Sequence, residues 1–300
     1  MPARMIDAHH HLYNLEENSY PWLQLDEPPQ LFVGDLRPVM KTYDIEDYLA
    51  DCLPSGVQKS VHIQVEWDPS DPVGETRWLQ GVADRHGFPH GIVASAHLHE
   101  EDVSDVLERH CELANIRGVR QMLLSHSDPL FNLSERADLL TDPQWRAGFA
   151  LLEPRGLSYD LQVYPHQMAD SADLAASFPD TQIVLDHAGL PIERESGGLE
   201  RWRAGLRGLA ACPNVAVKIS GLGQLDHNWT LESIRPIVTE TIEIFGVGRC
   251  MFASNFPIDS LYSDYATLIS SFETIVSDLG LSAAESDAIF YTNAERVYRL

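Results

Sequence analysis

The sequence is poor in basic residues. Its 300 residues include 21 Lys and Arg against 45 Asp and Glu, which gives a formal net charge of −24. A field of this sign repels the phosphates of nucleic acids and the surface of anionic bilayers, so we expect no nucleic acid and no membrane as a partner. An anionic substrate would need Arg or Lys residues in its pocket to overcome the global field.

Cysteine is also scarce, since the chain has only Cys52, Cys111, Cys212 and Cys250 and no C-x-x-C pair. This spacing argues against a disulfide scaffold and against a cysteine-based zinc site. No apolar run approaches the roughly 18 residues of a membrane helix. The first expected strand begins so close to Met1 that we expect no signal peptide. Together these features favour a cytoplasmic protein that acts on a small molecule.

The signatures of nucleotide-binding folds are absent. No G-x-G-x-x-G follows the first expected strand and no P-loop occurs, which argues against a doubly wound open sheet. Short apolar runs instead alternate with amphipathic segments. We expect eight strands, at 5–12, 60–66, 91–98, 117–124, 158–164, 182–187, 215–220 and 250–255. We expect nine helices, at 45–53, 75–86, 103–113, 142–151, 168–178, 199–211, 231–245, 265–279 and 285–297. This alternation predicts an α/β fold, a (β/α)₈ TIM barrel, as a single domain over residues 1–300.

One connection is far longer than the roughly two to six residues typical of such loops. Residues 13–43 separate the first strand from its helix and include Trp22 and several prolines. In a barrel this loop rises from the carboxyl-terminal face, where active sites lie. We interpret it as a lid over the site; the alternative is an ordered surface loop.

Histidines mark the ends of three expected strands. His9 and His11 close the first strand, and alternate side chains share a face, so we expect them together at the top of the barrel. His166 follows the fifth strand and His187 ends the sixth. Each alone could be a structural histidine. Four imidazoles at strand ends are typical of metal ligands or of groups that transfer protons.

Several motifs resemble the amidohydrolase-related branch of the amidohydrolase superfamily. They are Asp-Ala-His-x-His-Leu at 7–12, Tyr-Pro-Trp-Leu at 20–23 and the segments 160–167, 186–191, 217–221 and 251–257. Within that branch the chain is most similar to sugar lactonases such as L-fuconolactonase and L-rhamnonolactonase. The resemblance implies an amidohydrolase-like barrel that hydrolyses a sugar lactone (an aldonolactone) to the aldonic acid.

The resemblance also implies a set of metal ligands. Superfamily members bind one or two divalent ions through the H-x-H pair, histidines on strands five and six, and an Asp on strand eight. Here these would be His9, His11, His166 and His187, with zinc as the expected metal. Asn255 replaces the usual Asp, and an amide is a poor ligand for a transition metal and cannot accept a proton from water. Some lactonases in the branch are thought to need no metal, so metal-dependent and metal-independent chemistry both stay open.

The replacement leaves three interpretations of the missing proton acceptor. Asp259 lies four residues beyond Asn255 and can reach back into the site. Alternatively, one of the histidines is the base, because an imidazole titrates near neutral pH. In the third interpretation hydrolysis is lost, and the barrel only binds sugar acids.

Other polar and aromatic residues are candidates for binding substrate. Arg120 has the fork of donors that holds a carboxylate or polarises a lactone carbonyl. Glu66 is expected to face inward, and Trp22, Trp67 and Tyr164 can stack on a sugar ring. Lys218, if it faces the interior, needs a structural ion pair because an unpaired buried charge is costly. The alternative enzyme is a zinc-dependent amidohydrolase or a decarboxylase acting on a small carboxylated substrate.

Overall fold

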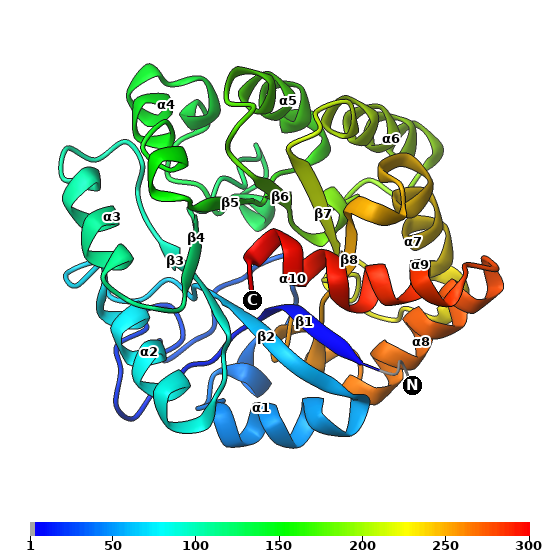
Figure 1. The fold of residues 1–300 in the computed structure, drawn as a ribbon, viewed down its shortest axis with the longest axis horizontal. Coiled ribbons are helices and arrows are strands. Elements are labelled where there is room, and N and C mark those ends of the chain that lie inside the picture. Colours follow the sequence, from blue (N-terminus) through cyan, green and yellow to red (C-terminus); the bar gives the residue numbers. More distant parts are fainter. Residues whose placement is uncertain (1–3) are drawn as a thin grey trace.

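The computed structural model describes residues 4–300 and contains the expected barrel (Figure 1). Eight parallel strands follow one another in the sheet in chain order, so the prediction of the fold is confirmed. They are β1 (Met5–His10), β2 (Val57–Ile63), β3 (Gly91–Ser95), β4 (Ile116–Arg120), β5 (Ser158–Leu161), β6 (Ile183–Leu185), β7 (Val215–Ile219) and β8 (Cys250–Phe252). Residues 1–3 of the expected domain lie outside the described part.

Helices surround the ring of strands, and the last of them, α10, crosses one end of the barrel (Figure 1). They are α1 (Ile45–Cys52), α2 (Gly74–His86), α3 (Val103–Cys111), α4 (Pro143–Phe149), α5 (Met168–Ser177), α6 (Ser196–Ala210), α7 (Leu231–Phe245), α8 (Tyr265–Asp278), α9 (Ala283–Asp287) and α10 (Asn293–Tyr298). The helix expected at 285–297 is therefore wrong as one element, because a π-helical turn at Ala288–Thr292 separates α9 from α10. Along residues 4–300, no helix has the length and apolar character of a membrane span.

The ring closes between its first and last strands through the chain just beyond β8. The backbone N–H of Asn255 donates to the carbonyl oxygen of His9 at 2.7 Å. The backbone N–H of His11 donates to the carbonyl oxygen of Phe256, also at 2.7 Å. Two histidines on one side of this seam and Asn255 on the other are thus held in fixed register.

The buried carboxylate of Asp7 reinforces the same seam from below. It accepts hydrogen bonds from the backbone N–H and the hydroxyl of Ser254, at 2.9 and 2.6 Å. The hydroxyls of Tyr48 on α1 and Tyr265 on α8 donate to the same oxygen as the Ser254 hydroxyl, at 3.1 and 2.9 Å. Because burial raises the pKa of a carboxyl group and these donors lower it, the hydrogen bonds offset part of the cost of burying this group.

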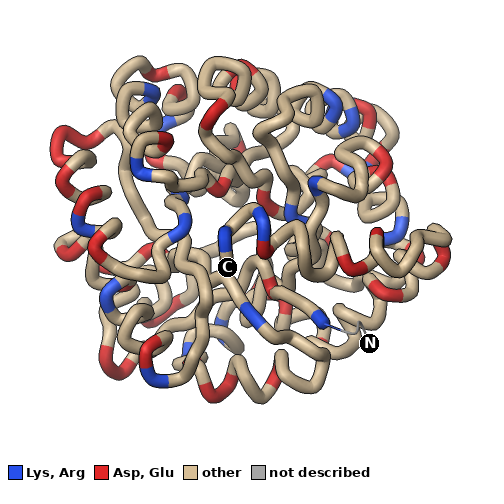
Figure 2. The backbone as a smooth tube through the Cα atoms, in the orientation of Figure 1, with Lys and Arg blue, Asp and Glu red and all other residues tan. Residues whose placement is uncertain are grey.

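The long segment between β1 and α1 contains only a short 3₁₀ turn, Arg37–Val39. Its two ends are joined, because Tyr13 and Tyr43 exchange backbone hydrogen bonds of 3.0 and 2.9 Å. The indole N–H of Trp22 donates to the carbonyl oxygen of Val65, at 2.8 Å, which fixes the segment to the loop after β2. Acidic residues are spread over the outer helices and loops (Figure 2), so the net charge belongs mainly to the periphery.

Candidate active site

A cavity of about 410 Å³ opens where the strands end, at the face on which barrel enzymes carry their sites. Its polar lining comes from the end of, or the segment after, every strand except β3. We call these residues the polar floor: His11, Gln64, Glu66, Arg120, Gln162, His187, Gln224 and Asn255. Apolar residues line the rest of the cavity, and many of them belong to the long segment after β1.

Two imidazoles on this floor are oriented by hydrogen bonds at Nδ1. The Nδ1 of His11 lies 2.8 Å from the carbonyl oxygen of Ile63, so Nδ1 carries the proton and Nε2 carries the lone pair. The Nδ1 of His187 lies 2.9 Å from the hydroxyl oxygen of Ser220. Burial lowers the pKa of both rings, that of His187 to about 4. Both imidazoles are therefore neutral at pH 7.

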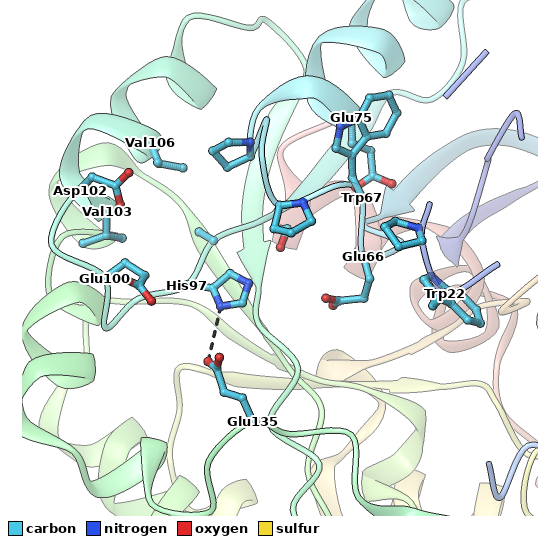
Figure 3. A pocket seen from close by; sticks show the side chains of 15 residues that line it. Trp22, Glu66, Trp67, Glu75, His97, Glu100, Asp102, Val103, Val106 and Glu135 are labelled. Carbon is cyan, nitrogen blue, oxygen red and sulfur yellow. Dashed lines mark ion pairs between the residues drawn. The ribbon is translucent and has the colours of Figure 1, made fainter. Parts of the chain in front are cut away.

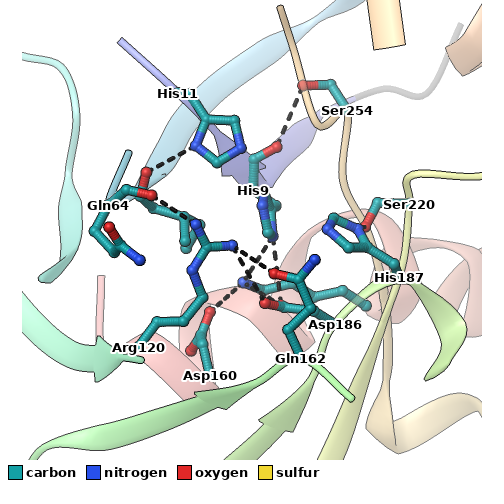
Figure 4. A network of polar contacts seen from close by, with 12 residues as sticks. His9, His11, Gln64, Arg120, Asp160, Gln162, Asp186, His187, Ser220 and Ser254 are labelled. Carbon is teal, nitrogen blue, oxygen red and sulfur yellow. Dashed lines mark hydrogen bonds and ion pairs between the residues drawn. The ribbon is translucent and has the colours of Figure 1, made fainter. Parts of the chain in front are cut away.

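His9 lies beneath these two rings in a buried charged network (Figure 4). The Nδ1 atom of His9 is 3.4 Å from the ammonium of Lys218 and 3.4 Å from a carboxylate oxygen of Asp186. Lys218 forms ion pairs with Asp160 and with Asp186, the latter at 3.2 Å. The hydroxyl of Tyr298 is 3.0 Å from both oxygens of Asp160. The inward lysine is therefore paired, as the sequence led us to expect.

Arg120 is held with its guanidinium on the cavity. One Nη donates to the side-chain oxygen of Gln162 at 3.0 Å, and the other donates to the carbonyl oxygen of Gln64 at 2.6 Å. The side chain of Arg120 is almost fully buried, and its nearest carboxylate in the network, Asp186, is 3.9 Å away. Because two of its five N–H groups are used in these bonds, others remain for a bound oxygen.

Asn255 and Asp259 form a buried pair at the end of β8. The side-chain amide of Asn255 donates to one oxygen of Asp259 at 3.1 Å. The other oxygen of Asp259 has no hydrogen-bond partner among residues 4–300, and burial raises the pKa of this carboxyl group to about 7. Asn255 lines the cavity, whereas Asp259 lies behind it. Asp259 thus reaches back, as one interpretation required, but it contacts Asn255 rather than the cavity itself.

Strained backbone brings three of the floor residues into place. Glu66, His187 and Asn255 have φ angles of 54°, 54° and 58°, in the left-handed region that non-glycine residues rarely adopt. Such outliers persist only where the surroundings enforce them, and they concentrate at functional sites. The three residues lie two to three positions beyond the ends of β2, β6 and β8.

Two expected site residues lie elsewhere. A 3₁₀ turn at Pro165–Gln167 carries His166 to the surface, where its Nε2 is 3.0 Å from the carbonyl oxygen of Ser125. The structure does not bring His166 together with His9, and His166 is not among the residues that line the cavity. Tyr164 is buried in an apolar cluster and donates to a backbone carbonyl oxygen, so it does not line the cavity either.

The remaining expected residues border a second cavity of about 570 Å³ (Figure 3). Trp67 lines only this second cavity, whereas Trp22 and Glu66 line both and form the wall between them. Its other lining residues include four acidic side chains, Glu75, Glu100, Asp102 and Glu135. Burial raises the pKa of the Glu75 carboxyl group to about 8, although the backbone N–H of Val65 donates to it and lowers the pKa.

The expected four-histidine metal set does not fit this arrangement. Across residues 4–300, no group of three or more His, Cys, Asp or Glu side chains is disposed to hold a metal ion. His166 is turned away, Asn255 supplies an amide, and the ammonium of Lys218 stands beside the Nδ1 of His9. A fixed cation at that distance opposes a second one.

Comparison with known proteins gives the family. The model of the family described as Amidohydrolase matches residues 6–300. The chain belongs to the amidohydrolase family. This membership agrees with the resemblance stated above, and it makes the protein a hydrolase of the amidohydrolase superfamily.

Individual relatives cover almost the whole chain of this amidohydrolase. An uncharacterized protein of Sinorhizobium fredii, y4mH, is 49% identical over 99% of this chain and 98% of its own length. An L-fucono-1,5-lactonase of Burkholderia multivorans is 28% identical over 100% and 97%, respectively. A crystal structure of an amidohydrolase from Burkholderia multivorans with bound zinc superposes with a TM-score of 0.83, at 26% identity, over 99% of this chain and 100% of that one.

Residues that shape the site differ in how far the sequence marks them. Gln64 and Gln162 are expected to face inward by strand parity, and both line the cavity. Gln224 lies in an irregular segment after β7, and the apolar lining depends on the course of residues 13–43. Neither follows from periodicity.

Proposed function

We propose that this amidohydrolase hydrolyses a lactone to the open hydroxy acid, with sugar lactones as the substrate class. The observation that carries the proposal is the guanidinium of Arg120 facing two neutral imidazoles, His11 and His187, across one cavity. The similarity to L-fucono-1,5-lactonases supports this choice of bond.

In the proposed reaction the ring carbonyl lies against Arg120. Water attacks the carbonyl carbon, and negative charge develops on the carbonyl oxygen. The free N–H groups of Arg120 stabilise this charge. Collapse of the tetrahedral intermediate breaks the bond to the ring oxygen and opens the lactone.

His187 accepts the proton of the attacking water at Nε2 and returns it to the leaving ring oxygen. The neighbouring carboxylate of Asp186 favours this role of His187. Its charge raises the pKa of the imidazole and so offsets part of the larger decrease that burial causes. The charges around His11 all lower its pKa, so His11 suits an orienting role through its Nε2 lone pair. Asn255, held by Asp259, orients the water and does not take its proton.

No step of this scheme passes through a metal ion. The polar groups that it uses come from the chain, and the ammonium of Lys218 occupies the space beside His9. A metal-dependent reaction is the competing scheme, and a chelator distinguishes the two.

The test is a pH-indicator assay of acid release from a panel of aldonolactones, with and without a chelator. We expect His187→Asn to lower kcat/KM by about 10²- to 10⁴-fold. The matched control is His86→Asn, a histidine exposed on the outer end of α2, which is expected to leave the rate unchanged. Full activity of His187→Asn would refute the assignment. Release of acid from amides or of CO₂ from carboxylated substrates, with no lactone turned over, would favour the amidohydrolase or decarboxylase alternatives.

A further inference from the structure

The lining of the cavity divides into a polar set and an apolar set. Besides the polar floor, apolar side chains line the cavity from three separate parts of the chain: the segment after β1, the segment after β4, and the turn after β8. We call the following residues the apolar roof: Leu31, Phe32, Leu36, Met122, Leu133 and Ile258.

The roof is not fully consumed by packing within the protein. Phe32 and Leu36 are buried in a cluster that is separate from the main barrel core. Leu31, Met122, Leu133 and Ile258 also join that cluster but are only half-buried, and all four line the cavity. When an apolar group of a ligand covers such open apolar surface, both surfaces leave water and the free energy of the complex falls.

The roof and the floor face the same ligand. A bare polyhydroxylated ring would place hydroxyl groups against the roof, where no donor or acceptor side chain answers them. Polar groups that lose water without a partner weaken binding. A ligand with one polar and one apolar end satisfies both sides.

From this division we infer that the substrate is not an unmodified sugar lactone but one in which an apolar substituent, an alkyl or aryl group of several carbons, replaces part of the hydroxyl groups. This rests on the proposed function. The ring carbonyl lies on the floor beside Arg120 and His187, and the substituent packs beneath the roof. The second cavity is a poor alternative for the substituent, because acidic side chains such as Glu100 and Glu135 line it.

Two parallel series test the inference. The first is hydrolysis of δ-lactones with no substituent, methyl, propyl and pentyl groups beside the ring oxygen, compared with aldono-1,5-lactones. The second is calorimetric binding of the corresponding δ-lactams, which are poor substrates for hydrolysis. We expect kcat/KM and lactam affinity to rise roughly fourfold for each added methylene until the roof is filled.

A pair of variants locates the effect. Leu31→Gln places a polar group in the roof and is expected to flatten both series. Leu25→Gln is the matched control, since Leu25 belongs to the same segment but is 49% exposed and does not line the cavity. It is expected to keep the slope of the unmodified protein.

The outcomes separate the two proposals. A flat lactam series, or a preference for aldonolactones over alkyl lactones, overturns the inference while leaving a lactonase. A rising lactam series with no lactone hydrolysed refutes the proposed function and keeps the apolar subsite. Equal slopes in Leu31→Gln and Leu25→Gln also overturn it, because the gain would then arise outside the roof.

Discussion

Replacing Lys218 with methionine tests whether the buried network beneath the cavity stabilises the barrel. The ammonium lies among Asp160, Asp186 and His9, and both carboxylates are fully buried. Methionine preserves most of the volume and removes the charge. Two buried carboxylates would then lose their closest cation, with Arg120 3.9 Å from Asp186 as the remaining one.

The expected loss follows from this geometry. Removing one partner of a buried ion pair costs about 3–5 kcal/mol, because the other partner stays desolvated without compensation. For a chain of this size about 2 °C of melting temperature corresponds to each kcal/mol, so we expect a decrease of roughly 6–10 °C. Differential scanning calorimetry at pH 8 measures it.

Lys59→Met is the matched control. Lys59 also lies on a strand and pairs with a carboxylate, that of Glu295 at 2.9 Å, but the side chains are 23% and 39% exposed. Exposed pairs of this kind contribute about 0–1 kcal/mol, so the melting temperature should fall by about 2 °C or less.

The loss of melting temperature in Lys218→Met is expected to depend on pH. Burial already raises the pKa of Asp160 to about 6 in the presence of Lys218. In Lys218→Met the carboxyl group of Asp160 can therefore take up a proton in mildly acidic solution. The decrease in melting temperature relative to the unmodified protein, which we call the deficit, should become smaller as the pH falls from 8 to 5. A deficit equal to that of Lys59→Met, or one that does not change with pH, would show that uncompensated carboxylates are not its cause.

Three further outcomes are expected. Arg120→Gln should lower kcat/KM by about 10²- to 10³-fold. Arg117→Gln is the control and should leave kcat/KM unchanged, because the guanidinium of Arg117 lies on the same strand but donates to backbone carbonyl oxygens away from the cavity. Equal losses in the two variants would contradict the role of Arg120. The pKa of Asp259 is raised from 3.8 to about 7, so the folded state holds its proton more tightly. Its contribution to stability is complete below about pH 4 and declines as the pH rises to 7. Asp259→Asn should therefore melt at increasingly higher temperature than the unmodified protein between pH 5 and pH 8, and parallel melting curves would argue against the shift. Finally, overnight dialysis against a chelator should leave lactone hydrolysis unchanged, and recovery of a lost rate on adding zinc would favour the metal-dependent scheme.

The barrel and part of its site follow from the sequence. The alternation of apolar runs and amphipathic segments predicted eight parallel strands in chain order, and all eight are present. Strand parity correctly grouped His9 with His11, and position at a strand end added His187. These features follow from the periodicity of apolar and polar residues along the sequence.

The misplaced residues depend on local backbone instead. The ring of His166 lies on the surface because Pro165, four residues beyond the end of β5, begins a 3₁₀ turn. The last expected helix is interrupted by a π-helical turn that no residue pattern marked. The apolar roof could not be predicted, since it depends on the paths of residues 13–43 and of the irregular segments after β4 and β8.

The seam between β1 and β8 has a practical consequence for handling the enzyme. Its two short backbone bonds, between His9 and Asn255 and between His11 and Phe256, join the catalytic groups as well as the ends of the sheet. A partial opening at this join would scatter the histidines before the remaining strands separate. Residual activity during storage or heating should therefore decline ahead of the circular dichroism signal, and it would be the earlier indicator of damage to a preparation.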